Sequence, residues 1–350
     1  GGLQPVVVNT GQHRELIDQV IRLFGIRVDT DLAVMTPDQS LARLTSRLVT
    51  AIDETLVRVE PEMVLVQGDT TTVLAGALAS FYRRTPVGHV EAGLRTGNLA
   101  SPFPEEANRQ LTTRLAALHF APTNRSRDNL LGEGVPSSSV LVTGNTVIDA
   151  LQHEVARQHG DAGGGVIDRV RKLVGSGYDE RPVVLVTGHR RENFGDGFEQ
   201  ICSALVTLAG RFRDHLFVYP VHLNPNVQRV VGDRLGEAEN IRLLPPQPYS
   251  EFVCLLDKCR LILTDSGGVQ EEAPSLGKPV LVMRDTTERP EGVEAGVVRL
   301  VGPVEGRIVD EATRLLTDAD AYRAMSSPAN PYGDGHAATR IVDAVADFLS

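Results

Sequence analysis

Tryptophan is absent from this chain of 350 residues, and aromatic residues make up only 5% of it. Polysaccharides and single-stranded nucleic acids are commonly bound by stacking on such side chains, so the composition argues against both ligands. The formal net charge is −10, which also argues against non-specific binding of nucleic acid. An anionic substrate must therefore be held by local positive groups and not by the overall field.

Cysteine and long apolar runs are also scarce. The three cysteines, Cys202, Cys254 and Cys259, lie in apolar contexts without metal-ligand spacing, which predicts buried thiols in a reducing compartment and a cytoplasmic protein. No apolar run approaches the roughly 18 residues of a membrane span, so we expect no membrane association. The segment 318–320 resembles an Asp-x-Asp metal motif, but it precedes a helix far from any strand end. We therefore expect no metal and no cofactor.

The pattern of the chain predicts two α/β domains. At 350 residues the chain exceeds one typical core, and apolar strand-like runs alternate with helix-like segments throughout. We expect an N-terminal Rossmann-like domain over 1–157, a boundary in the glycine-containing segment 158–165, and a second Rossmann-like domain over 166–336. The amphipathic segment 337–350 is expected to be a terminal helix that packs back on the first domain. Two such domains predict an active site in the cleft between two sets of strand ends.

One stretch, 261–291, indicates a nucleotide site. A short apolar run at 261–263 is followed by Asp-Ser-Gly-Gly and then by a helical segment with Glu271 and Glu272. Glycines at such a turn let backbone N–H groups and the positive helix end approach a phosphate. A carboxylate one turn further along can accept both ribose hydroxyls. The motif is short, however, and an ordinary turn between strand and helix with two solvated glutamates is the alternative.

Titratable groups stand at further strand ends and helix starts: Asp69, Glu91, Glu105, Glu106 and His189. Carboxylates in such positions are costly unless they are paired or functional, and neighbouring ones separate into an acid and a base. Less specific interpretations remain open. Asp69 could cap the helix that follows it, and Glu105 and Glu106 could complement a helix dipole.

Several long motifs together resemble the non-hydrolysing UDP-N-acetylglucosamine 2-epimerases of bacteria, and the resemblance covers essentially the whole chain. These motifs are GDTTT (68–72), HVEAGLRTG (89–97), PEEANR (104–109), TGNTVIDAL (143–151), TGHRREN (187–193), YPVHLNPNV (219–227) and TDSGGVQEEAPSLGKPVLVMRDTTERPE (264–291). The resemblance implies a GT-B fold and the interconversion of UDP-GlcNAc and UDP-ManNAc for surface polysaccharide synthesis. It also implies a homodimer.

The family chemistry implied by this resemblance is elimination and re-addition. UDP leaves C1 together with the C2 proton, giving a 2-acetamidoglucal, and the proton returns on the opposite face. The resemblance assigns catalysis to four residues, without settling which carboxylate moves which proton: Asp69, Glu91, Glu105 and His189. It assigns substrate binding to seven others: Arg109, Phe252 near the uracil, Ser266, Gly267, Gly268, the ribose ligand Glu272 and Arg289.

Two further expectations come from the family. Its members usually begin with a strand that ends in Gly-Thr-Arg-Pro-Glu, so we expect an N-terminal piece to precede Gly1. Some members also bind a second UDP-GlcNAc as an activator, and Gln12, Glu106, Arg190 and His222 match positions used there. Glu15 and Asp38 differ from the Gln and Arg of some activated members, so allosteric activation is a hypothesis.

Four alternatives remain. A GT-B glycosyltransferase shares the fold, but the carboxylate set of Asp69, Glu91 and Glu105 favours elimination. A hydrolysing epimerase differs only in the fate of the glycal, which exclusion of water decides. An epimerase for a related UDP-2-acetamido sugar is a third alternative, and a UDP-sugar sensor without turnover is a fourth.

Overall fold

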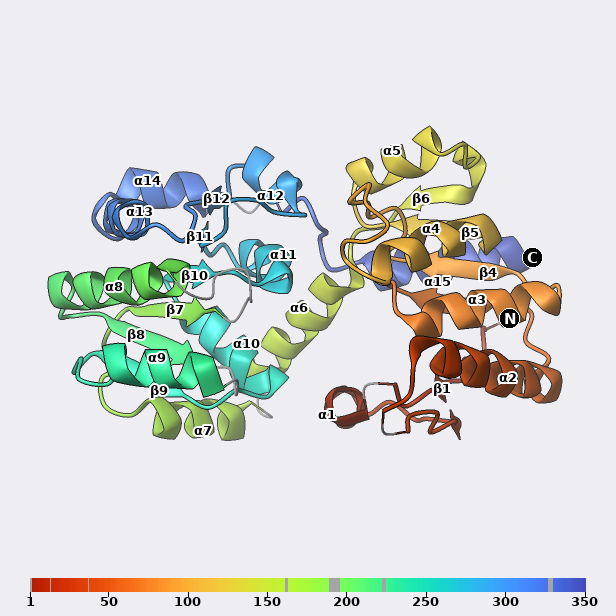
Figure 1. Cartoon of the computed structure of the whole chain (residues 1–350), viewed down its shortest axis with the longest axis horizontal. Helices are drawn as coiled ribbons and strands as arrows, with labels where there is room; N and C mark the ends of the chain where they lie inside the picture. Colours follow the sequence, from red (N-terminus) through yellow and green to blue (C-terminus); the bar gives the residue numbers. More distant parts are fainter. Residues whose placement is uncertain are drawn as a thin grey trace. The chain divides into compact units, whose positions relative to one another are not determined.

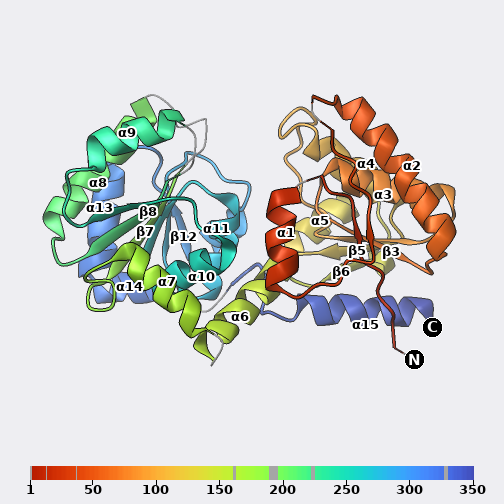
Figure 2. The same cartoon turned by 90° about the horizontal axis from the view of Figure 1, so that it is seen from below.

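The computed structural model describes residues 2–12, 14–36, 38–160, 163–188, 196–221, 225–326 and 330–350. The chain forms two compact units, one of residues 1–146 with 335–350 and one of residues 147–334. Each contains parallel strands with helices between them (Figures 1 and 2). The segment 158–165 lies inside the second unit, and Leu151 of the helix before it packs into that unit's core.

The first unit has a sheet of four parallel strands in the order β3-β4-β5-β6, and a separate parallel pair β1-β2. Its elements are β1 (Val8–Asn9), α1 (Arg14–Leu23), β2 (Thr30–Asp31), α2 (Leu41–Val59), β3 (Val64–Gln67), α3 (Thr71–Tyr82), β4 (Val87–Val90), α4 (Glu105–Leu115), β5 (Leu118–Ala121), α5 (Asn124–Gly132), the 3-10 helix η1 (Ser137–Ser139), β6 (Val140–Val142) and α15 (Ala337–Leu349).

The C-terminal helix α15 completes the core of the first unit. Its Ile341 and Val345 are buried and pack against Val90, Leu118 and Phe120 of β4 and β5. Figure 2 shows α15 lying along this sheet. Since these contacts join the end of the chain to strands about 220–255 residues earlier, α15 is part of the first unit in structure although it is last in sequence.

The second unit has a six-stranded parallel sheet in the order β12-β11-β10-β7-β8-β9. Its elements are α6 (Thr146–His159), α7 (Gly164–Val174), β7 (Val183–Thr187), α8 (Asp196–Arg211), β8 (Leu216–Pro220), α9 (Pro225–Leu235), β9 (Ile241–Leu244), α10 (Tyr249–Lys258), β10 (Leu261–Thr264), α11 (Gly267–Ser275), β11 (Val280–Val282), α12 (Pro290–Glu294), β12 (Val298–Leu300), α13 (Glu305–Thr317) and α14 (Ala319–Met325).

The strand order of the second unit reverses between β7 and β10. The chain adds β8 and β9 on one side of β7, and then places β10, β11 and β12 on the other. In open α/β sheets, ligands bind beyond the carboxyl ends of the strands at such a reversal. Here those ends are Thr187 and Thr264, whose buried hydroxyl oxygens lie 2.5 Å apart. The fold therefore places the carboxyl end of β10 at the natural ligand site of this sheet.

Two segments show where regular structure begins or is interrupted. In the segment 4–8 only Val8 lies in a strand, where it and Asn9 pair with β2, and Val6 is exposed. The segment 305–325 is helical apart from Asp318, whose carboxylate accepts hydrogen bonds from the backbone N–H groups of Asp320 and Ala321 at the start of α14. None of the helices in the described ranges is long and apolar enough to cross a membrane.

Candidate functional site

A cavity of about 280 Å³ lies at the strand reversal of the second unit. It is formed by residues at or after the carboxyl ends of β7, β8, β9 and β10 and by residues of α10 and α11: Thr187, Gly188, Pro220, Pro246, Gln247, Phe252, Ser266, Gly268, Val269 and Glu272. Four residues expected to bind substrate, Phe252, Ser266, Gly268 and Glu272, thus line one cavity. The fold brings them together because the loops after neighbouring parallel strands open at the same edge of the sheet.

The Ser266–Gly267 turn has a cation beside it. Ser266 is the N-cap of α11, and its N–H donates to Thr264 Oγ1 at 2.9 Å. A Cβ atom built on Gly267 would lie 3.3 Å from the Arg289 guanidinium, which in turn donates to Glu271 at 2.6 Å. A helix N-terminus and an adjacent arginine are the two groups that favour a phosphate. The chemistry of the turn is therefore suited to an anion, and Glu271 orients the arginine beside the turn.

Glu272 is buried beside this turn, with 8% of its surface exposed. Burial, and to a lesser extent the neighbouring charge of Glu271, raises the pKa of Glu272 to about 7. A buried carboxylate is stabilised when hydroxyl groups donate hydrogen bonds to it. The environment of Glu272 therefore suits a diol such as a ribose.

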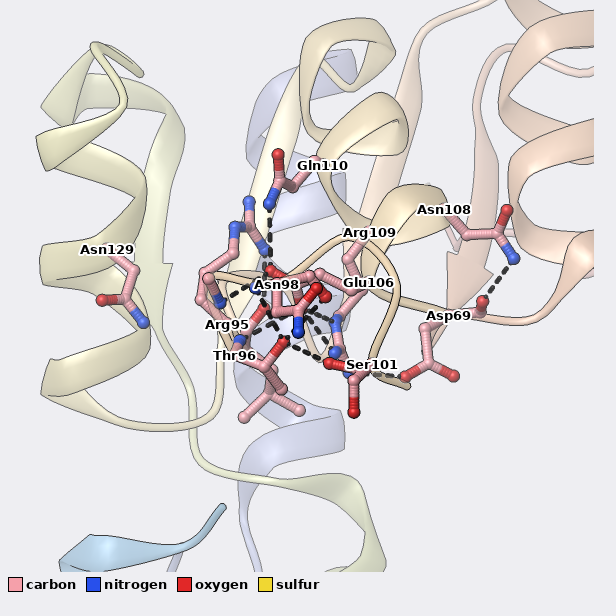
Figure 3. A network of polar contacts seen from close by, with 12 residues as sticks. Asp69, Arg95, Thr96, Asn98, Ser101, Glu106, Asn108, Arg109, Gln110 and Asn129 are labelled. Atoms are coloured by element: carbon pink, nitrogen blue, oxygen red, sulfur yellow. Dashed lines mark hydrogen bonds and ion pairs between the residues drawn. The ribbon is translucent and has the colours of Figure 1, made fainter. Parts of the chain in front are cut away.

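In the first unit, Arg109 joins two carboxylates (Figure 3). Its Nη1 donates to Asp69 Oδ2 at 2.8 Å, and its Nη2 donates to Glu106 Oε2 at 2.6 Å. The Arg109 side chain is 8% exposed, Glu106 is fully buried, and Asp69 is 30% exposed. Of the two carboxylates, only Asp69 therefore offers an accessible oxygen to a ligand. The N-cap of α3 is Thr70, so Asp69 does not have the capping role that its position allowed.

Both carboxylate oxygens of Glu106 accept hydrogen bonds from residues of the first unit. One oxygen accepts from Thr96 N–H and Arg109, and the other accepts from Gly97 N–H and Gln110. Burial acts to raise the pKa of Glu106, but the hydrogen bonds from Gln110, Arg109 and Thr96 outweigh it and the pKa is lowered. The carboxylate thus holds the loop after β4 against α4.

Glu91 lies close to the Gly68–Asp69 loop, at the end of the neighbouring strand. A Cβ atom on Gly68 would lie 3.7 Å from Glu91 Oε2, and both residues have left-handed backbone angles, with φ of 81° for Gly68 and 65° for Glu91. Strained angles of this kind in a non-glycine residue cluster at functional sites. Because β3 and β4 are paired and parallel, their ends bring the carboxylates of Asp69 and Glu91 to one edge.

Glu105 and Gln12 complete the predicted residues of the first unit. Glu105 begins α4 and is partly exposed, one position from the buried Glu106. Gln12 accepts hydrogen bonds from the N–H and the hydroxyl of Thr72, at 3.2 and 2.6 Å. Gln12 therefore binds the first turn of α3, next to Asp69. Three other predicted residues, His189, Arg190 and His222, lie outside the described residues.

Gln247 and Asn108 lie at these sites but were not predicted from the sequence. Gln247 lines the cavity from the loop after β9, and its place at a strand end was the available signal. Asn108 donates to the backbone carbonyl of Asp69 at 2.9 Å, from within the PEEANR motif. Arg95, which follows β4, donates hydrogen bonds to Glu133 and Thr113. In the part of the chain that the structure describes, no three His, Cys, Asp or Glu side chains are arranged to hold a metal ion.

Comparison with known proteins identifies the family. A family model described as UDP-N-acetylglucosamine 2-epimerase matches residues 1–346. The chain belongs to the UDP-N-acetylglucosamine 2-epimerase family. It is 58% identical to a probable UDP-N-acetylglucosamine 2-epimerase of Ralstonia solanacearum, over 99% of this chain and 92% of that protein. It is 55% identical to the UDP-N-acetylglucosamine 2-epimerase of Escherichia coli K12, over 96% of this chain and 89% of that protein.

Solved structures of the UDP-N-acetylglucosamine 2-epimerase family share the fold. The UDP-GlcNAc 2-epimerase of Neisseria meningitidis, solved bound to UDP-GlcNAc, superposes with a TM-score of 0.88 at 47% identity and covers 98% of this chain and 92% of its own. The predicted fold class is thereby confirmed as GT-B, with two Rossmann-like domains. The expectation that the chain is an isomerase is confirmed as well.

Proposed function

We propose that this protein interconverts UDP-GlcNAc and UDP-ManNAc by eliminating UDP and adding it back. The main support for this proposal is that each of the two units contains a different set of functional groups. The second unit has a cavity of about 280 Å³ that is lined by Ser266, at the start of α11, and by the buried Glu272. The first unit has the carboxylates of Asp69 and Glu91 at neighbouring strand ends. The membership of the chain in the epimerase family supports the same reaction.

In the proposed reaction, a carboxylate removes the C2 proton while the C1–O bond breaks and its electron pair leaves with UDP. The product is a glycal with a C1–C2 double bond. A protonated group then returns a proton to the opposite face of C2, and UDP adds back to C1. We assign the proton transfers to the set of Asp69, Glu91 and Glu105, with His189 near the diphosphate. The cation at the phosphates is Arg289, held by Glu271 at 2.6 Å.

Proton NMR in D₂O with UDP-GlcNAc alone tests this proposal. We expect a UDP-ManNAc signal to grow, with deuterium at C2 and no early release of free ManNAc. Free ManNAc as the main product would indicate the hydrolysing reaction instead. An unchanged spectrum would contradict epimerisation of this sugar.

From the family resemblance we also propose a homodimer in the cytoplasm, and a monomer mass in sedimentation equilibrium would contradict the dimer.

We propose that Glu272 accepts the ribose hydroxyls, which makes nucleoside binding depend on pH. The ionised carboxylate is the better acceptor, and the pKa of Glu272 is raised to about 7. Affinity should therefore rise with pH through about 7 and level off above it, and below 7 it should fall by up to about tenfold per pH unit. Calorimetric titration with uridine between pH 5.5 and 8.5 measures this change without the titration of a phosphate.

The matched variant for this titration is Glu272→Gln, which keeps the shape of the side chain but cannot ionise. Its uridine affinity should be weaker at pH 8.5 and nearly constant over the same range. A pH slope that survives in Glu272→Gln would assign the dependence to another group. A flat profile in the unchanged protein would show that the ribose does not need the ionised carboxylate.

A further inference from the structure

Two buried side chains hold consecutive backbone carbonyls on either side of the Asp69 Cα atom. His89 of β4 has its Nε2 atom 2.8 Å from the carbonyl oxygen of Gly68. Asn108 of α4 donates from Nδ2 to the carbonyl oxygen of Asp69 at 2.9 Å. His89 has none of its surface exposed and Asn108 has 5%. The two contacts come from different elements and meet at one residue.

These contacts determine the backbone conformation of Asp69. Because a peptide group is planar, fixing the Gly68 carbonyl fixes the plane before the Asp69 Cα atom, and fixing the Asp69 carbonyl fixes the plane after it. The peptide plane before Gly68 is tied to the sheet as well, because the Gly68 N–H donates to Val90 O at 3.0 Å. The two planes set φ and ψ of Asp69, and therefore the direction of its side chain. His89 and Asn108 contact only the backbone on either side of Asp69, whereas Arg109 contacts its carboxylate.

The protonation state of His89 suits a permanent contact. A carbonyl oxygen only accepts hydrogen bonds, so the Nε2 atom must carry the proton. Burial lowers the pKa of His89 to about 4, although its bond to Gly68 acts in the opposite direction. The ring is therefore neutral at ordinary pH, and the hydrogen bond does not change over the range in which the enzyme would work.

We propose that His89 and Asn108 are positioning residues that aim the Asp69 carboxylate at the sugar, a role that rests on the proposed epimerase function. Neither needs to touch the substrate. A misplacement of about 1 Å in a reacting group can cost a factor of about 10² in rate. Loss of either contact should thus lower kcat and leave nucleotide binding, which we place in the second unit, unchanged.

The test compares variants that keep or remove the donor. His89→Leu and Asn108→Asp remove a donor at similar volume, whereas the amide nitrogen of His89→Gln can replace the imidazole Nε2. We expect kcat to fall about 10- to 100-fold in the first two and to recover to within about threefold in His89→Gln. The Kd for UDP should stay constant in all three. The control is Thr112→Val, since the hydroxyl of this buried α4 residue has no hydrogen-bond partner among the described residues and its removal should leave kcat unchanged.

The outcomes separate this role from a structural one and from failure of the proposed function. Unchanged kcat in folded His89→Leu and Asn108→Asp would overturn the proposal. So would a His89→Gln variant that regains the melting temperature but not kcat. If the unchanged protein shows no epimerisation, the proposed function fails first. The hydrogen bond from His89 to the Gly68 carbonyl is then tested by ¹⁵N NMR of the imidazole. A proton on Nδ1 in place of Nε2 at pH 7 would refute this hydrogen bond.

Discussion

Asp69→Asn should lower kcat for epimerisation by a factor of about 10² to 10⁴, the usual contribution of a general acid or base. Asparagine keeps the shape of the side chain and an oxygen that can accept from Arg109, now 2.8 Å away. It cannot take up or release a proton near neutral pH. The fold and the affinity for UDP should therefore be retained, while deuterium incorporation at C2 slows in parallel with kcat.

The control for this variant is Asp53→Asn, the same substitution in the same unit. Asp53 makes an ion pair with Arg83 at 2.6 Å, and both side chains are substantially exposed. This variant should keep the full kcat, because an exposed ion pair contributes little. The assignment of Asp69 would be contradicted by an Asp69→Asn enzyme whose kcat is within about threefold of the unchanged protein.

Arg109→Met should reduce the free energy of unfolding by about 3–5 kcal/mol, because removing one partner of a buried ion pair leaves an uncompensated charge. Methionine preserves much of the apolar stem. It leaves the fully buried Glu106 carboxylate without the guanidinium that lies 2.6 Å away, and it also removes the cation beside Asp69. Urea denaturation followed by circular dichroism measures the loss, and kcat should fall as well.

Two further variants show whether the buried charge is the cause. Arg83→Met removes an exposed arginine from the same unit and should cost only about 0.2–1 kcal/mol. Glu106→Gln placed on the Arg109→Met background removes the unpaired charge, so the double variant should regain part of the stability. Equal losses in Arg109→Met and Arg83→Met, or a double variant less stable than Arg109→Met, would rule out this account.

Much of the architecture was predictable from local patterns. Leu44, Leu48, Ile52 and Leu56 recur every four residues, a spacing typical of a helix, and all four are buried on one face of α2. The run at 261–263 predicted β10, because strands buried on both faces are continuously apolar. Elements with weaker signals were missed. The helix α7 begins at Gly164, in a segment interpreted as a flexible boundary, and α9 and β12 were not predicted.

The amino-acid sequence by itself determined the alternation of strands and helices, the turn at Ser266–Gly267 and the set of carboxylates at strand ends. It did so because strands, turns and helix starts depend on residues that are close along the chain. Only the tertiary structure decided which of these groups meet. Glu105 and Glu106 are adjacent in the sequence, yet the helix turns one toward partial exposure and buries the other against Arg109. His89 and Asn108 reach the two carbonyls around Asp69 from 21 and 39 residues away, since long-range packing, and not local pattern, brings hydrogen-bond partners together.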